Sequence, residues 1–192
     1  MPSGQVSALH SVTTPLNEGA DAIIDTAIVL GRRLLEQCTD TPQHIGIALD
    51  GLLNRQGTLI YAENDLRVLQ DKPLQGLLED ALGVPVHLEN TVNTIALAEA
   101  YHGAGDNCRS VLYLYADISI GGAFVYEGRI WHGAHAGAGQ IGYLLTGWMG
   151  QKPIKLNERA SGAGIATQYN MRSRKFRVPA LDEIIQYAAQ GD

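Results

Sequence analysis

Apolar residues in the first part of the chain recur with the period of a helix. Between residues 17 and 37 they return at mostly three- and four-residue intervals, after Pro15 and with Asn17 placed as an N-cap. This spacing predicts a long helix with one apolar side. The short apolar run from His44 to Leu49, closed by Asp50-Gly51, predicts a strand covered on both faces.

Strands and helices continue to alternate through the middle of the chain. Pro73 is suited to the first turn of a helix and Gly83 to its end. The pattern predicts, in chain order, a helix, a strand and a helix at residues 73–82, 84–88 and 90–101. This order is typical of an α/β chain.

Gly, Ala, Asp and Asn gather at residues 103–109 and predict a hinge between two lobes. We expect a partial α/β lobe at residues 1–105 and a partial lobe of β-hairpins and helices at residues 106–192. A hairpin turn is predicted at Glu127-Gly128. In the second lobe we expect three antiparallel strands and then two helices, at residues 111–116, 122–126, 129–131, 158–172 and 181–189.

Composition narrows the classes of function. The chain has 192 residues and a net charge of −6, which argues against a nucleic-acid reader, because such modules cluster Lys and Arg. No apolar run approaches the about 18 residues that span a bilayer. The N-terminus lacks the order of a secretory signal, so we expect a cytoplasmic protein without a membrane partner.

The two cysteines and one basic cluster indicate no chemistry of their own. Cys38 and Cys108 have no second cysteine or histidine at ligand spacing, which favours idle thiols over a disulfide or a metal site. One basic cluster is best interpreted as a solvated helix end or connecting loop. It comprises Arg172, Arg174, Lys175 and Arg177.

Several motifs follow one another in a fixed order along most of the chain, which is less expected by chance than one Gly-rich run. They occupy residues 45–51, 62–66, 84–98, 111–128, 133–144 and 156–166. By these stretches the sequence resembles the ROK family, a group of repressors, reading frames and sugar kinases within the actin-like ATPase superfamily.

The resemblance implies an α/β fold of the actin-like (ribonuclease H-like) ATPase type with two lobes. We expect the chain to lack the first strands of that fold, with residues 5–13 forming only the last strand of the opening sheet. The closing helices after residue 192 are also expected to be missing. Such a sheet has open edges that favour pairing with another chain, so we expect a homodimer.

The strongest single match is Glu89-Asn90-Thr91-Val92-Asn93, where catalytic family members have Glu-Asn-Asp-Ala-Asn. The resemblance implies that this Asp removes a proton from the attacking sugar hydroxyl. Thr91 stands in its place and has no carboxylate. A general base contributes about 10²- to 10⁴-fold, so we expect no catalytic residue at this position.

Residues 116–122 stand where the kinases have a phosphate-binding hairpin, Gly-Thr-Gly-Ile-Gly-Gly. Two glycines and the Thr are replaced, and Asp117 adds a negative charge that repels phosphates. The alternative is that Asp117 is a surface turn residue that never approaches phosphate. The degenerate loop residues are Asp117, Ser119, Gly121 and Gly122.

The sugar-facing positions implied by the resemblance are partly kept. Gln140 replaces a Glu, Tyr143 replaces a His and Asn157 replaces another Glu, and all three new side chains still hydrogen-bond hydroxyls. Asn residues also commonly serve as turn or helix-cap residues, which leaves both interpretations open for Asn64 and Asn90. The sugar-binding candidates are Gly51, Asn64, Asn90, Gln140, Tyr143 and Asn157.

No cofactor is expected. ATP with Mg²⁺ would be expected only if the protein is a kinase. The family's zinc site needs cysteines after the Gly-rich loop, and residues 147–156 contain none. We expect packing of Trp148 and Met149 to take its place.

Three functions stay open. The first is a sugar-sensing and dimerisation domain of a transcriptional regulator, which contacts DNA only through a domain outside this chain. The second is an ATP-dependent sugar kinase with degraded motifs. The third is an inactive remnant.

Overall fold

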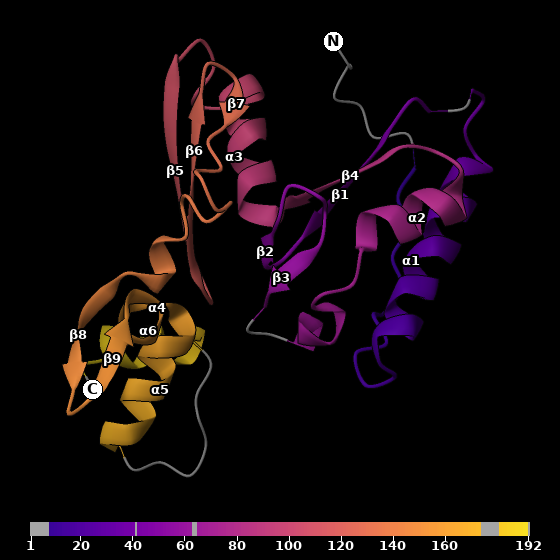
Figure 1. The fold of residues 1–192 in the computed structure, drawn as a ribbon. Coiled ribbons are helices and arrows are strands. Elements are labelled where there is room, and N and C mark those ends of the chain that lie inside the picture. Colours follow the sequence, from indigo (N-terminus) through magenta and orange to yellow (C-terminus); the bar gives the residue numbers. More distant parts are fainter. Residues whose placement is uncertain (1–7, 41, 63–64, 174–180, 192) are drawn as a thin grey trace. The chain divides into compact units, whose positions relative to one another are not determined.

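The computed structural model describes residues 8–40, 42–62, 65–173 and 181–191. Its contacts divide the chain into two compact units, residues 1–91 and 92–192, and each is described by itself. The mixture of helices and small sheets confirms the α/β class (Figure 1). The lobe limits at residues 105 and 106 stay a prediction.

The first unit combines helices with two small sheets. Strands β1 and β4 pair in parallel, with Leu49 beside Asn90 at their carboxyl ends. Strands β2 and β3 form an antiparallel hairpin. The bounds are α1 Ala20–Leu35, β1 Ile45–Leu49, β2 Leu52–Leu53, β3 Leu59–Tyr61, the 3₁₀ helix η1 Asp65–Leu69, α2 Leu74–Leu82 and β4 Val86–Asn90.

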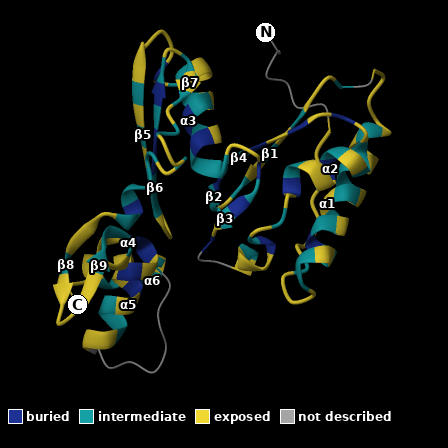
Figure 2. Cartoon of the chain, viewed as in Figure 1, coloured by how far each residue is buried: buried dark blue, intermediate teal, exposed yellow. Residues whose placement is uncertain are grey.

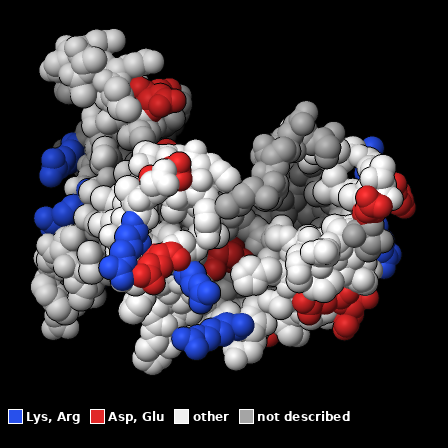
Figure 3. Space-filling view, turned by 90° about the horizontal axis from the view of Figure 1, so that it is seen from above, with Lys and Arg blue, Asp and Glu red and all other residues white. Residues whose placement is uncertain are grey.

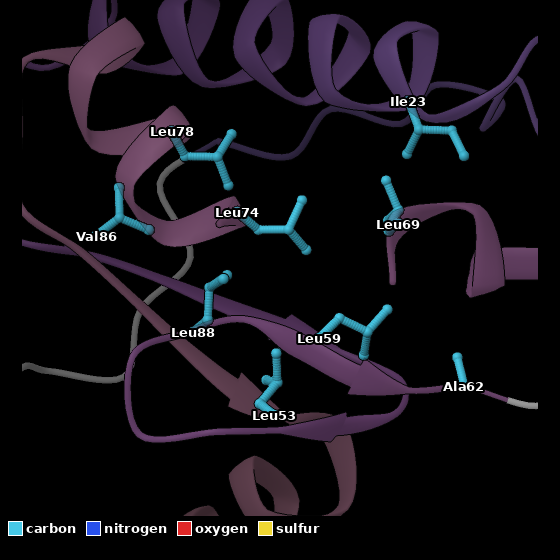
Figure 4. Packing of buried hydrophobic residues seen from close by; sticks show 9 residues of the cluster. All are labelled: Ile23, Leu53, Leu59, Ala62, Leu69, Leu74, Leu78, Val86 and Leu88. Atoms are coloured by element: carbon cyan, nitrogen blue, oxygen red, sulfur yellow. The ribbon is translucent and has the colours of Figure 1, made fainter. Parts of the chain in front are cut away.

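One apolar cluster holds this unit together (Figure 4). Leu74 and Leu78 lie one helical turn apart on α2, and Val86 and Leu88 alternate along β4. Leu59 is fully buried. The buried members of the cluster are Ile23, Leu53, Leu59, Ala62, Leu69, Leu74, Leu78, Val86 and Leu88.

Three details of this unit differ from the sequence prediction. Gly19, and not Asn17, is the N-cap of α1 and makes no side-chain capping bond. Strand β1 is not covered on both faces, because Gly46 and Ala48 are exposed. The described part of the predicted first strand, residues 8–13, is not a strand, and residues 5–7 lie outside the described ranges.

The second unit begins with α3 (Thr91–His102) and a three-stranded antiparallel sheet in the order β5-β6-β7. The strands are β5 Ser110–Ala116, β6 Ile120–Tyr126 and β7 Arg129–Ile130, close to the three antiparallel strands predicted for this part of the chain. Glu127 and Gly128 form the turn with φ of 48° and 73°, the positive values of a type I′ hairpin. A small core of Ala96, Ala123 and Val125 joins α3 to the sheet.

The rest of this unit contains an element that the sequence did not predict, the hairpin of β8 and β9. The predicted helix at residues 158–172 is divided at Ser161, whose Oγ accepts a 3.0 Å bond from the Gly164 N–H and so caps a second helix. The bounds are the 3₁₀ helix η2 Ile141–Tyr143, β8 Leu145–Met149, β9 Lys152–Lys155, α4 Leu156–Ala160, α5 Gly162–Ser173 and α6 Leu181–Ala189.

The surface shows no broad basic region on the face drawn in Figure 3, within the part of the chain described there. Of the basic cluster, Arg172 is exposed near the end of α5, and the other three members lie outside the described residues. Cys38 and Cys108 are exposed free thiols. Among the described residues, no helix is both long and apolar enough to cross a membrane.

Candidate functional site

The carboxyl ends of β1 and β4 bring together two of the predicted sugar-binding residues. Asn90 Nδ2 donates a 2.8 Å hydrogen bond to the carbonyl oxygen of Gly51. Gly51 has φ of 130°, and a Cβ there would lie 2.5 Å from the Leu59 side chain and 2.7 Å from the Tyr61 oxygen. Only glycine fits at position 51. The contact therefore depends on the backbone conformation of Gly51. Asn64 lies outside the described residues.

Thr91 is the first residue of α3 and directly follows this contact. The neighbouring carboxylate belongs to Glu89. It accepts a 2.8 Å hydrogen bond from the Asn90 backbone N–H, which holds it against the local backbone. Ligands of parallel sheets bind outside the carboxyl ends of the strands. Position 91 is therefore well placed for a reacting group, and it carries a hydroxyl in place of a carboxylate.

Sequence reasoning gave no role to Asp50, which is exposed immediately after β1. Leu49 pairs with Asn90, so Asp50 leaves the sheet at the same edge as Thr91. The signal was available in the sequence as an acidic residue at the end of an apolar strand. It was used only to end the strand.

In the second unit, the degenerate phosphate loop is the turn between β5 and β6. The Asp117 N–H donates to the Ser119 carbonyl at 3.0 Å, and Tyr115 donates its hydroxyl proton to Asp117 Oδ2 at 3.1 Å. The backbone N–H groups at the start of α5, Gly162 and Ala163, donate to the carbonyls of Asp117 and Ile118 at 2.8 and 3.2 Å. These two donors are therefore occupied by protein, where a helix start otherwise attracts anions.

The start of β6 also meets the Gly-rich segment. A Cβ on Gly122 would lie 3.1 Å from the Gly139 oxygen, and a Cβ on Gly142 would meet the Ile120 oxygen and the Asn157 amide. Gly121 lies against the Val92 side chain. These glycines permit close approach of two backbone segments and of the Asn157 side chain, so the degenerate loop, residues 139–143 and Asn157 are gathered in one place.

The polar candidates of this unit have identifiable contacts. Asn157 Oδ1 accepts a 2.7 Å bond from the Ile120 N–H. Gln140 is the N-cap of η2, without a side-chain capping bond, and the Lys155 ammonium lies 4.5 Å from the Tyr143 ring centre. That these residues together form a sugar site stays a prediction.

Residues 147–156 cover most of the β8–β9 hairpin and the first residue of α4. Trp148 and Met149 are 66% and 64% exposed, so the prediction that they pack in place of zinc is wrong. A two-stranded hairpin has two faces, and little of this one is covered. Among the described residues, no three His, Cys, Asp or Glu side chains gather as metal ligands.

The chain matches solved structures of the actin-like sugar-kinase fold. The chain belongs to the ROK family, whose family model matches residues 2–192. The ROK hexokinase of Thermus thermophilus has a similar structure, with a TM-score of 0.79 and 28% identity over 94% of this chain and 61% of that one.

Curated relatives include both kinases and repressors. A glucokinase of Halalkalibacterium halodurans is 30% identical over 85% of this chain and 52% of its own length. A putative xylose repressor of a Caldicellulosiruptor strain is 26% identical over 73% of this chain and 36% of its own length. The chain thus spans about half or less of these two relatives.

Proposed function

We propose that this chain is a sugar-sensing and dimerisation domain of a ROK transcriptional regulator, without kinase activity. The observation that carries the proposal is Thr91, which places a hydroxyl at the start of α3 beside the Asn90–Gly51 contact. A hydroxyl does not serve as general base at neutral pH, which removes about 10²- to 10⁴-fold of rate.

The loop between β5 and β6 supports the same conclusion. Asp117 adds a carboxylate to it, and the first N–H groups of α5 already bind its carbonyls. A nucleotide phosphate would have to displace these bonds and approach the negative charge. We therefore propose that neither ATP, Mg²⁺ nor zinc is a cofactor of this chain. DNA would be contacted only by a domain that this chain does not include.

A sugar can regulate such a domain only if it binds two conformations with different affinities. Gly51 and Asn90 offer a fixed backbone and amide for hydroxyl groups in one unit, and Gln140, Tyr143 and Asn157 offer polar side chains in the other. The sugar and its derivatives are the proposed small-molecule partners. The kinship with a putative xylose repressor supports the regulatory function, and the kinship with a glucokinase supports the kinase considered below.

Thermal unfolding with a panel of hexoses, pentoses and amino sugars tests this proposal. A sugar at a hundredfold excess over its Kd stabilises the folded state by about 2.7 kcal/mol, whereas ATP with Mg²⁺ should have no effect. Asn90→Ala should abolish the sugar response. Asn54→Ala is the matched control, because the Asn54 side chain is also hydrogen-bonded to the backbone of the first unit, as acceptor from two N–H groups, but lies in the β2–β3 turn.

A second candidate function, an ATP-dependent sugar kinase, is favoured by Asp50. Its exposed carboxylate follows β1 at the sheet edge where Thr91 follows β4. A phosphorylated sugar product that is lost in Asp50→Asn, with unchanged unfolding, would establish the kinase and overturn the main proposal. If neither sugars nor ATP changed the melting temperature, the inactive remnant would be the better interpretation.

A further inference from the structure

The end of β9 and the start of α4 lie against the segment that follows η2. The Leu156 N–H donates a 2.8 Å hydrogen bond to the Leu144 carbonyl oxygen, and Lys155 pairs with Leu145 in the hairpin. Both strands of the hairpin are largely exposed (Figure 2), whereas Ile154 and Lys155, at the end of β9, are half-buried. Lys155 therefore lies where the hairpin joins the rest of the second unit.

This junction contains two of the candidate sugar-binding residues, Tyr143 and Asn157. The Asn157 amide lies against Gly142, where a Cβ would be 2.7 Å from the amide nitrogen, and its Oδ1 accepts the hydrogen bond from Ile120. The Lys155 ammonium lies 4.5 Å from the centre of the Tyr143 ring. A cation within about 6 Å of an aromatic ring centre is attracted to the face of the ring. A positive charge thus holds Tyr143 beside Asn157.

The residues of this junction do not fit a metal ion. Proteins bind zinc through Cys, His, Asp and Glu. Residues 147–156 contain no cysteine, and within the described ranges no three such side chains gather. A Lys ammonium has hydrogen-bond donors and no acceptor, so it is not a metal ligand while it is protonated. Lys155 instead brings a positive charge to Tyr143 on a covalently attached side chain.

A second lysine of the same hairpin has a different contact. The Lys152 ammonium lies 3.1 Å from Glu158 Oε1, while the backbone N–H of Lys155 donates to Glu158 Oε2 at 3.4 Å. The two lysines therefore offer a matched pair for mutation, because one ammonium contacts a carboxylate and the other contacts an aromatic ring.

We propose that Lys155 is a positioning residue for Tyr143 and holds its ring by a cation–π contact, without a metal ion. The contact fixes the ring, and with it η2, against the start of α4. The Tyr143 hydroxyl is then presented at a fixed place to a sugar hydroxyl. The positioning role rests on the proposed sugar-sensing function, whereas the contact itself exists without any ligand.

A double-mutant cycle tests the contact in the absence of sugar. Urea unfolding of Lys155→Met, Tyr143→Leu and the double variant is followed by tryptophan fluorescence, since both tryptophans lie in the second unit. The two changes should couple by about two- to fivefold in the unfolding equilibrium constant, as exposed cation–π pairs do. In a second cycle, Tyr143→Phe keeps the ring and should show no such coupling with Lys155→Met. Additive effects of Lys155→Met and Tyr143→Leu would overturn the inference.

Sugar binding tests the positioning role. The dissociation constants of glucose, xylose and N-acetylglucosamine are measured by titration calorimetry. For a sugar that binds, Lys155→Met should raise the Kd about two- to tenfold, the range for one misplaced hydrogen bond. Lys155→Arg should restore the Kd, because a guanidinium also stacks on aromatic rings.

Lys152→Met is the matched control. It removes the other ammonium of the hairpin and its contact with Glu158, and should leave the Kd unchanged. An equal rise in both methionine variants would show a general loosening of the hairpin and overturn the positioning role. If none of the three sugars binds, the proposed function fails in this test, while the double-mutant cycle still decides whether the contact exists.

Added Zn²⁺ tests the metal-free character of the junction. Neither Zn²⁺ nor EDTA should change the melting temperature of the parent, because a ligand raises it only by binding the folded state. A rise with Zn²⁺ that is lost in Tyr143→Phe would place a metal ion at residue 143 and overturn the inference.

Discussion

At the scale of single residues, Asn157 shows that a site candidate can also have a structural task. Its Oδ1 accepts a hydrogen bond from the Ile120 N–H at 2.7 Å, next to the degenerate phosphate loop. A half-buried N–H that loses its acceptor costs about 1–3 kcal/mol. Any loss of ligand binding in an Asn157 variant must therefore be separated from loss of stability.

Two substitutions make that separation. Asn157→Ala should lower the free energy of unfolding by about 1–3 kcal/mol, measured by urea denaturation. Asn157→Asp keeps an oxygen acceptor and should keep most of the stability. If sugar binding is lost in both variants, Asn157 contacts the ligand. If the alanine variant is as stable as the parent, the hydrogen bond to Ile120 does not contribute and this interpretation is wrong.

At the scale of elements, a salt bridge connects the β8–β9 hairpin to α4. The Lys152 ammonium lies 3.1 Å from Glu158 Oε1, and the Lys155 N–H donates to the other oxygen of Glu158 at 3.4 Å. The hydrogen bond from Lys152, above all, holds the pKa of Glu158 below its ordinary value of 4.5. This carboxylate is therefore easier to ionise in the folded protein than in the unfolded chain.

The sign of the pH effect follows from that direction. A lowered pKa contributes stability that is complete above the ordinary carboxyl range and is lost as the pH falls through the folded pKa. Glu158→Gln keeps an acceptor but does not titrate, so the stability difference between parent and variant should shrink on acidification and at high salt. Urea midpoints at a series of pH values measure it. A difference that stays constant with pH would contradict the assignment.

Elements with a strong period were predictable, and those without one were not. The helix α1 was predicted from its apolar residues at three- and four-residue intervals, and α2 was predicted from Pro73 and from Gly83, which ends it in the left-handed conformation. The β8–β9 hairpin was missed because Lys, Pro and Gly interrupt its apolar residues, and both of its faces are largely exposed. Exposed strands lack the alternation that burial imposes.

The candidate site was predictable in its parts only. Thr91 was identified because a motif surrounds it, whereas Asp50 has no such motif and gains interest only from the parallel pairing of β1 with β4. The hydrogen bonds from the Gly162 and Ala163 N–H groups to the β5–β6 turn join positions more than forty residues apart in the sequence. No local sequence pattern predicts such long-range bonds.

At the scale of the whole molecule, the two units have separate cores of different size. Among the described residues, the first contains nine buried apolar residues in one cluster, and the second contains a cluster of three. Separate cores allow separate unfolding steps, in which case a single midpoint does not describe the chain. We expect the two units to unfold in distinguishable transitions.

The two tryptophans make this expectation measurable, because Trp131 and Trp148 both belong to the second unit. Leu59→Ala removes a fully buried side chain from the first core and should cost about 2–5 kcal/mol there. The far-ultraviolet circular dichroism transition should then broaden toward lower urea, while tryptophan fluorescence keeps its midpoint. Val125→Ala, in the second core, should shift the fluorescence transition instead. If Leu59→Ala moved both signals equally, the units would be folding as one cooperative body.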